Sequence, residues 1–87
     1  NNIKHLILQG CNINDETIKL LKNCKFPILK KLLLGNNMIG DSGIKSLIYC
    51  IQLTKLDTLD VSSNNIREGI KYFIDCKHFE TLEKLYL

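Results

Sequence analysis

Residues 29–39 read LKKLLLGNNMI, and residues 56–66, which begin 27 positions further along the chain, read LDTLDVSSNNI. Residues 3–13 read IKHLILQGCNI and place aliphatic and polar residues at the same positions. All three stretches fit the pattern L-x-x-L-x-L-x-x-N/C-x-L, in which isoleucine or valine replaces some of the leucines. A loose apolar pattern that matches once means little, but three full matches at nearly constant spacing identify an internal repeat.

The repeat divides the chain into units. Full units cover about residues 3–28, 29–55 and 56–81, and a fourth begins at residues 82–87 with LEKLYL. We therefore expect a single domain over residues 1–87, or a fragment of one, because 87 residues make one small core. Neither end resembles the polar capping unit that closes a repeat stack. We expect further repeats or neighbouring chains at these uncapped ends.

Each unit begins with a pattern typical of a short strand. Leu6 and Leu8 alternate with His5, Ile7 and Gln9, and the other units repeat this alternation. Because the units follow one another in the same direction, their strands should form one parallel sheet. Parallel neighbours need a long crossover, which the second half of each unit supplies.

The second half of each unit predicts a helix. Its apolar stripe has the spacing of three and four that an amphipathic helix needs: Ile18 and Leu21, then Ile44, Leu47 and Ile48, then Ile70, Phe73 and Ile74. Asn14 or Asp15 should cap the first helix, and Asp41 or Ser42 the second. Unit three is one residue shorter at this point, so we expect a tighter entry that relies on Gly69.

Over essentially its whole length, the chain resembles the leucine-rich repeat family. The period of 26 or 27 residues and Cys11, at a position where the other units have asparagine, are similar to the ribonuclease-inhibitor-like and cysteine-containing subclasses. The resemblance implies an α/β solenoid: a short curved stack with a parallel β-sheet on the concave side and α-helices on the convex side. It also implies an interaction scaffold. A fragment of a regulatory protein, such as a GTPase-activating protein or a ubiquitin-ligase substrate-recognition subunit, is an alternative.

Cys11, Asn37 and Asn64 occupy equivalent positions just after the three strands. An asparagine side chain both donates and accepts, so it can satisfy backbone groups that the inward turn buries. We interpret these residues as a structural ladder along the stack rather than as ligands.

Three further cysteines recur at intervals of 26 residues: Cys24, Cys50 and Cys76. The C-x2-C pairs of zinc sites are absent, and we expect the three to pack as small apolar residues at the ends of the helices. Unpaired buried thiols fit a reducing compartment, so the expected location is intracellular and cytoplasmic.

Catalysis has no recognisable basis in the sequence. His5 and His78 fall on different faces, and no serine or cysteine stands in a pattern with a base and an acid. The phosphate-binding pattern G-x-x-x-x-G-K-[ST] is also absent. We therefore expect no enzyme, cofactor, metal or small-molecule substrate. Every apolar run is too short for a membrane span.

The residues that alternate with the buried leucines predict the binding site for a partner protein. Reading across the stack gives three columns: His5, Lys31, Thr58 and Lys84; Ile7, Leu33, Asp60 and Tyr86; Gln9, Gly35 and Ser62. Two aliphatic side chains side by side in a solvent-facing column, next to basic ones, are unexpected unless a partner covers them. The alternative is that both are isolated surface residues shielded by lysine stems.

The convex helices offer a rival site. Lysines 19, 22, 25, 45, 71 and 77 lie there and could bind nucleic acid or an acidic membrane surface. Acidic residues 16, 41, 68 and 75 interrupt them, and the net charge is only +3, which disfavours that reading.

Overall fold

The computed structural model describes residues 2–49, 53–74, 76 and 79–87. Its elements alternate between strand and helix, as the repeat predicts. In chain order they are β1 (His5–Ile7), α1 (Asp15–Leu21), β2 (Lys31–Leu33), α2 (Asp41–Ile48), β3 (Thr58–Asp60), the 3₁₀ helix η2 (Glu68–Ile70), α3 (Lys71–Ile74) and β4 (Lys84–Tyr86).

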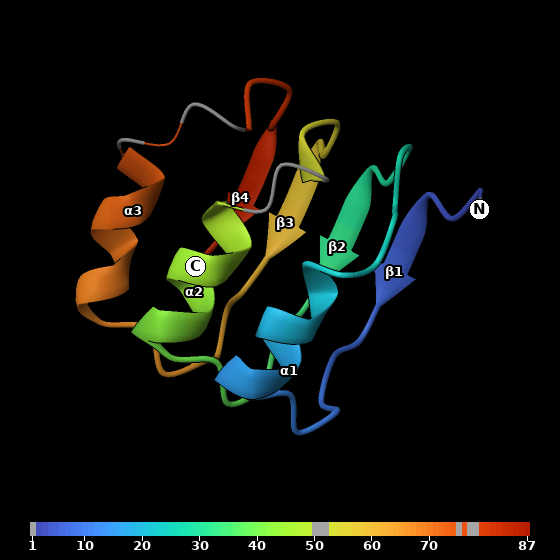
Figure 1. Cartoon of the computed structure of the whole chain (residues 1–87). Coiled ribbons are helices and arrows are strands. Elements are labelled where there is room, and N and C mark those ends of the chain that lie inside the picture. The colour runs from blue at the N-terminus through green and yellow to red at the C-terminus, as the bar shows by residue number, and fades with distance from the viewer. Residues whose placement is uncertain (1, 50–52, 75, 77–78) are drawn as a thin grey trace.

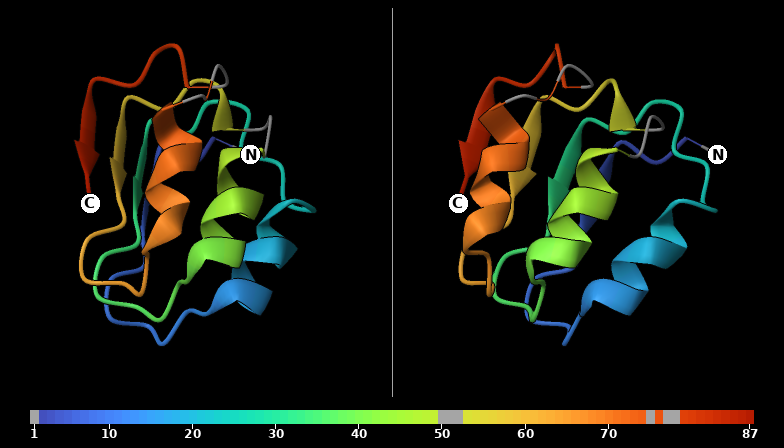
Figure 2. Two further views of the ribbon diagram at one scale, coloured as in Figure 1. Left: turned by 90° about the vertical axis from the view of Figure 1, so that its left-hand side faces the viewer. Right: turned by 60° about the vertical axis from the view of Figure 1, so that its left-hand side comes forward.

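The strands form one parallel sheet in the order β1-β2-β3-β4. Leu6 pairs with Leu32, Leu32 with Leu59 and Leu59 with Leu85, so equivalent residues of successive units lie side by side without a shift. The helices all lie on one face of this sheet, and the molecule has two layers (Figures 1 and 2). The expected α/β stack of leucine-rich repeats is confirmed.

The core lies between the two layers. Leu32, Leu34 and Leu59 from the sheet side and Ile44 from α2 have no exposed surface. Burying each such side chain contributes about 1.5–3 kcal/mol. Leu85 is 36% exposed, because β4 lies at the edge of the sheet and has a neighbour on one side only.

The predicted asparagine ladder is present. The Oδ1 atom of Asn37 accepts hydrogen bonds from the backbone N–H groups of Cys11 and Ile13, both at 2.9 Å. Its Nδ2 atom donates to the carbonyl of Leu8 at 2.9 Å and to carbonyls of its own turn. Asn64 makes corresponding bonds to unit two. Each asparagine therefore fastens its own unit to the one before it.

The cysteines differ in part from expectation. Cys24 is exposed, because α1 ends three residues earlier, at Leu21, and Cys24 lies in the turn that follows. The prediction that it packs as a small apolar residue is wrong. Cys76 is half-buried against the core, as expected, and Cys50 lies outside the described residues. Cys11 is also exposed, with Sγ donating to the carbonyl of Gln9 at 3.4 Å.

The third helix presents a different face from the one predicted. Ile70 and Ile74 are 43% and 78% exposed, while Tyr72 and Phe73 pack against the core. The expectation that both isoleucines point inward is wrong. The 3₁₀ turn η2, which replaces the first helical turn in unit three, has about three residues per turn instead of 3.6. The residues that follow are therefore rotated relative to those of α2.

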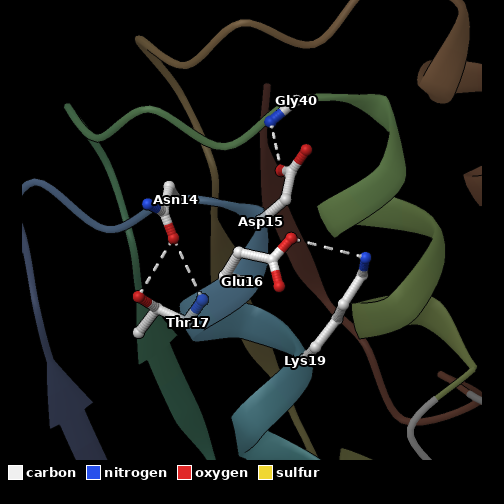
Figure 3. A network of polar contacts seen from close by, with 6 residues as sticks. All are labelled: Asn14, Asp15, Glu16, Thr17, Lys19 and Gly40. Carbon is white, nitrogen blue, oxygen red and sulfur yellow. Dashed lines mark hydrogen bonds and ion pairs between the residues drawn. The ribbon is translucent and has the colours of Figure 1, made fainter.

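The helix starts join neighbouring units. Asn14 caps α1 as predicted, because its Oδ1 accepts from the backbone N–H of Thr17 at 3.1 Å (Figure 3). The N-cap of α2 is Gly40, which makes no side-chain cap bond, so neither predicted cap of that helix is correct. Instead, Asp15 reaches across to unit two and accepts from the N–H of Gly40 at 2.7 Å (Figure 3).

Asp41 repeats this contact one unit further along. Its Oδ1 accepts from the backbone N–H groups of Arg67 at 2.8 Å and Gly69 at 2.9 Å. These bonds hold the pKa of Asp41 below its ordinary value of 3.8, the bond from Arg67 having the largest effect. The tighter entry predicted around Gly69 is confirmed by η2.

Candidate protein-binding face of the sheet

One face of the sheet carries no helix in the described part of the chain (Figure 2). Because side chains alternate along a strand, the residues next to the buried leucines project from this face. We call it the open sheet face, and its residues are His5, Ile7, Gln9, Lys31, Leu33, Gly35, Thr58, Asp60, Ser62, Lys84 and Tyr86. The unshifted register aligns them in columns, as the sequence predicted.

The central column is apolar at both ends. Ile7 is 62% exposed, its neighbour Leu33 is half-buried, and Tyr86 on β4 is 50% exposed. Asp60 stands between Leu33 and Tyr86. Covering an exposed aliphatic side chain is worth about 1.5–3 kcal/mol. The pair formed by Ile7 and Leu33 is therefore the part of this face with most to gain from a partner.

A basic column runs beside it. His5 and Lys84 are exposed and Lys31 is half-buried, in line with Thr58 between the two lysines. Thr58 is only 6% exposed, and its Oγ1 donates to Oδ1 of Asp57 at 2.8 Å. The expectation that Thr58 is open to solvent is wrong: it lies on an interior strand between Lys31 and Lys84, and its hydroxyl is bonded to Asp57.

Asp60 is held in place by a neighbour that sequence reasoning did not pair with it. Ser62 donates to Oδ1 of Asp60 from its backbone N–H at 2.9 Å and from its Oγ at 2.6 Å. The signal was available, because Asp-x-Ser is a common local side-chain-to-backbone turn. Gly35 is buried beside them, and a Cβ there would lie 3.4 Å from Oδ2 of Asp60. Oδ1 of Asp60 therefore already accepts two hydrogen bonds, and these bonds fix the orientation of the carboxylate.

The helix side carries exposed lysines with contacts of their own. Lys19 forms an ion pair with Glu16 at 3.8 Å (Figure 3). The Nζ atoms of Lys45 and Lys71 lie 5.8 and 5.7 Å from the centre of the Tyr72 ring, within the range of cation–π attraction. Lys77 lies outside the described residues.

The described ranges contain neither a cluster of metal ligands nor a membrane-spanning helix. No group of three or more His, Cys, Asp or Glu residues there is placed to hold a metal ion. None of the helices within those ranges is long and apolar enough to cross a bilayer.

Stacked strand–helix units that are joined by asparagine side chains define a repeat protein. The leucine-rich repeat family model matches residues 1–21, 27–47 and 52–69, and the chain belongs to the leucine-rich repeat family. It is 36% identical over 90 residues to leucine-rich repeat-containing protein 42 of Danio rerio. That similarity covers 94% of this chain and 21% of the relative, so the chain spans about a fifth of the relative's length. The ribonuclease-inhibitor-like and cysteine-containing subclasses stay a prediction.

Proposed function

We propose that the chain is a non-catalytic protein-interaction module that binds a partner protein on the open sheet face. The single observation that carries this proposal is the pair Ile7 and Leu33, which lie in register on neighbouring strands of a face that no described helix covers. Exposed apolar side chains with charged ones beside them are typical of protein interfaces. Membership of a family of interaction scaffolds supports the same role.

The test compares matched lysine substitutions on the two layers. Ile7→Lys and Leu33→Lys place a charge on the open sheet face, and Leu20→Lys places the same charge at a 64% exposed leucine on α1. Each variant is immobilised beside the unaltered chain and exposed to the same cell extract. We expect one or more proteins to be lost from both sheet-face variants and retained by Leu20→Lys.

Folding and the rival site are checked in the same experiment. Circular dichroism and the thermal midpoint should stay close to those of the unaltered chain for Ile7→Lys, whose side chain is 62% exposed. A protein lost from Leu20→Lys alone would move the site to the helix side. Binding of unrelated nucleic acid that falls steeply with salt would favour the basic convex face instead.

We also propose that the chain works in a reducing, cytoplasmic compartment. Cys11 and Cys24 form no disulfide, and both are exposed. Exposed thiols persist where glutathione keeps them reduced and oxidise outside the cell. Titration of thiols in protein isolated under alkylating conditions tests this, and a disulfide-linked species would contradict it.

A further inference from the structure

The open sheet face has a spacing that selects one shape of partner. We propose that its occupant is an amphipathic α-helix of a partner protein, lying across the strands along the stack, with acidic residues on its flanks. This inference rests on the proposed function and specifies the partner that the same face recognises. Three observations carry it: the spacing of the central column, the width of the face and the charge of the column beside it.

The spacing comes from the register. Ile7, Leu33, Asp60 and Tyr86 pair directly from strand to strand, so they lie about 4.8, 9.6 and 14.4 Å along the sheet from the first of them. Residues i, i+3, i+7 and i+10 of an α-helix rise by about 4.5, 10.5 and 15 Å and lie on one stripe. The two series agree within about 1 Å over the whole sheet.

An extended segment does not match this column. Its side chains that point the same way recur about every 6.6 Å, so a strand lying along the stack is out of step by the second contact. The helical spacing is also the same when read in the opposite direction. Either orientation of a helix is therefore compatible with the column.

The width of the face agrees with a helix. The outer columns, represented by Lys31 and Gly35, are four residues apart along the chain, which is at most about 13 Å in an extended backbone. A helix with its side chains is about 10–12 Å across. It would cover the central column and bring its flanks over the columns on either side.

The charges beside the central column determine which residues the partner helix should carry on its flanks. His5, Lys31 and Lys84 form a basic row on one side of the central column, while Gln9, Gly35 and Ser62 on the other side are uncharged. Glutamate or aspartate on the helix flank satisfies the basic row. Opposite Asp60, whose carboxylate Ser62 holds in place, the helix should present a lysine, an arginine or a hydrogen-bond donor.

The probe is a phage-displayed library of random linear peptides, about twenty residues long, which is long enough to span the sheet as a helix. The library is panned on the 87-residue chain, and each binder is then measured on Ile7→Lys, Leu33→Lys and Leu20→Lys. Binders that lose affinity for the first two variants and keep it for the third occupy the open sheet face. Those binders decide the inference.

We expect these binders to carry apolar residues at spacings of three and four, with acidic neighbours. Proline in the middle of a selected peptide should weaken binding about ten-fold or more relative to alanine at the same position, because it breaks the helix. Replacing both Lys31 and Lys84 by glutamate should weaken binding about five-fold or more at low salt, and less at high salt.

The contrary outcomes separate the two proposals. Face-dependent binders that tolerate proline, or whose apolar residues alternate with a period of two, would overturn the helical partner and leave the binding face standing. Binders that are all indifferent to Ile7→Lys and Leu33→Lys would overturn the proposed function itself.

Discussion

The carboxylate of Asp41, in the second repeat, and the backbone N–H of Gly69, in the third, are joined by a hydrogen bond of 2.9 Å. Position 69 also has no room for a side chain, because a Cβ atom there would lie 2.7 Å from Oδ1 of Asp41. One unit earlier the Asp15 carboxylate accepts from the N–H of Gly40 and leaves no room for a Cβ at position 43, where a side chain would clash with it. The helix-start aspartates thus act between repeats, and each requires a glycine in the next unit.

Gly69→Ala should lower the free energy of unfolding by about 1–3 kcal/mol. The new methyl group displaces the Asp41 carboxylate, which then loses its bonds to the N–H groups of Arg67 and Gly69. Urea denaturation measures the change. Ser42→Ala, at an exposed position in α2, is the control and should stay within about 0.5 kcal/mol. Equal losses of stability in Gly69→Ala and Ser42→Ala would show that the close contact between position 69 and Asp41 makes no specific contribution to stability.

Stability should fall in acid partly through Asp41. Backbone N–H groups of Arg67 and Gly69 lower its pKa in the folded chain, so its contribution is complete above the ordinary aspartate pKa. It is lost as the pH falls through the lowered, folded-state pKa. Thermal midpoints measured between about pH 5 and pH 2 should therefore decline less steeply for Asp41→Asn than for the unaltered chain. Glu80→Gln, which removes an exposed carboxylate, should leave that slope nearly unchanged.

Asn64→Ala should lower the free energy of unfolding by about 2–4 kcal/mol. The substitution leaves the N–H of Ile39 and the carbonyl of Leu34 without the partners that the amide supplies at 2.9 and 3.0 Å. Asn65→Ala is a matched control one residue away, because that side chain is exposed. Urea denaturation of the two variants separates them, and similar midpoints would argue against a ladder role for Asn64.

The repeat period made most of the fold predictable. Leu6, Leu32, Leu59 and Leu85 pair in one unshifted register because equivalent positions of a repeat must stack in a sheet. The bonds of Asn37 followed from its chemistry, since an amide is the side chain that satisfies buried donors and acceptors together. Both predictions concern positions that recur from unit to unit, so each further unit supplied independent support for them.

One prediction failed where the repeat breaks its period, and another failed although its spacing is regular. The missing residue before Ile70 converts the helix start into a 3₁₀ turn and rotates Ile74 out to solvent, which a helical projection drawn from α2 does not foresee. Cys24 was placed by its spacing to Cys50 and Cys76, although α1 ends before it. Helix length depends on packing that is weakly encoded in spacing alone.

The columns of the open sheet face were predictable, but the accessibility of single residues was not. Strand alternation placed Ile7 beside Leu33 and Lys31 beside Thr58. Burial of Thr58 depends on the lengths and directions of the neighbouring side chains, which a sequence pattern does not contain.

Ser63→Gly should raise the free energy of unfolding by about 0.5–1 kcal/mol. Ser63 has φ of 54°, in the left-handed region, and the equivalent residues of units one and two are Gly10 and Asn36, with φ of 63° and 57°. Glycine and asparagine adopt this conformation at lower cost than serine. Ser63→Asn should therefore also stabilise the chain, and Asn36→Ser should destabilise it. Ser42→Gly, within α2, is the matched control and should lower stability by up to about 0.5 kcal/mol. If Ser63→Gly lowers the urea midpoint as Ser42→Gly does, the backbone angle at position 63 carries no strain.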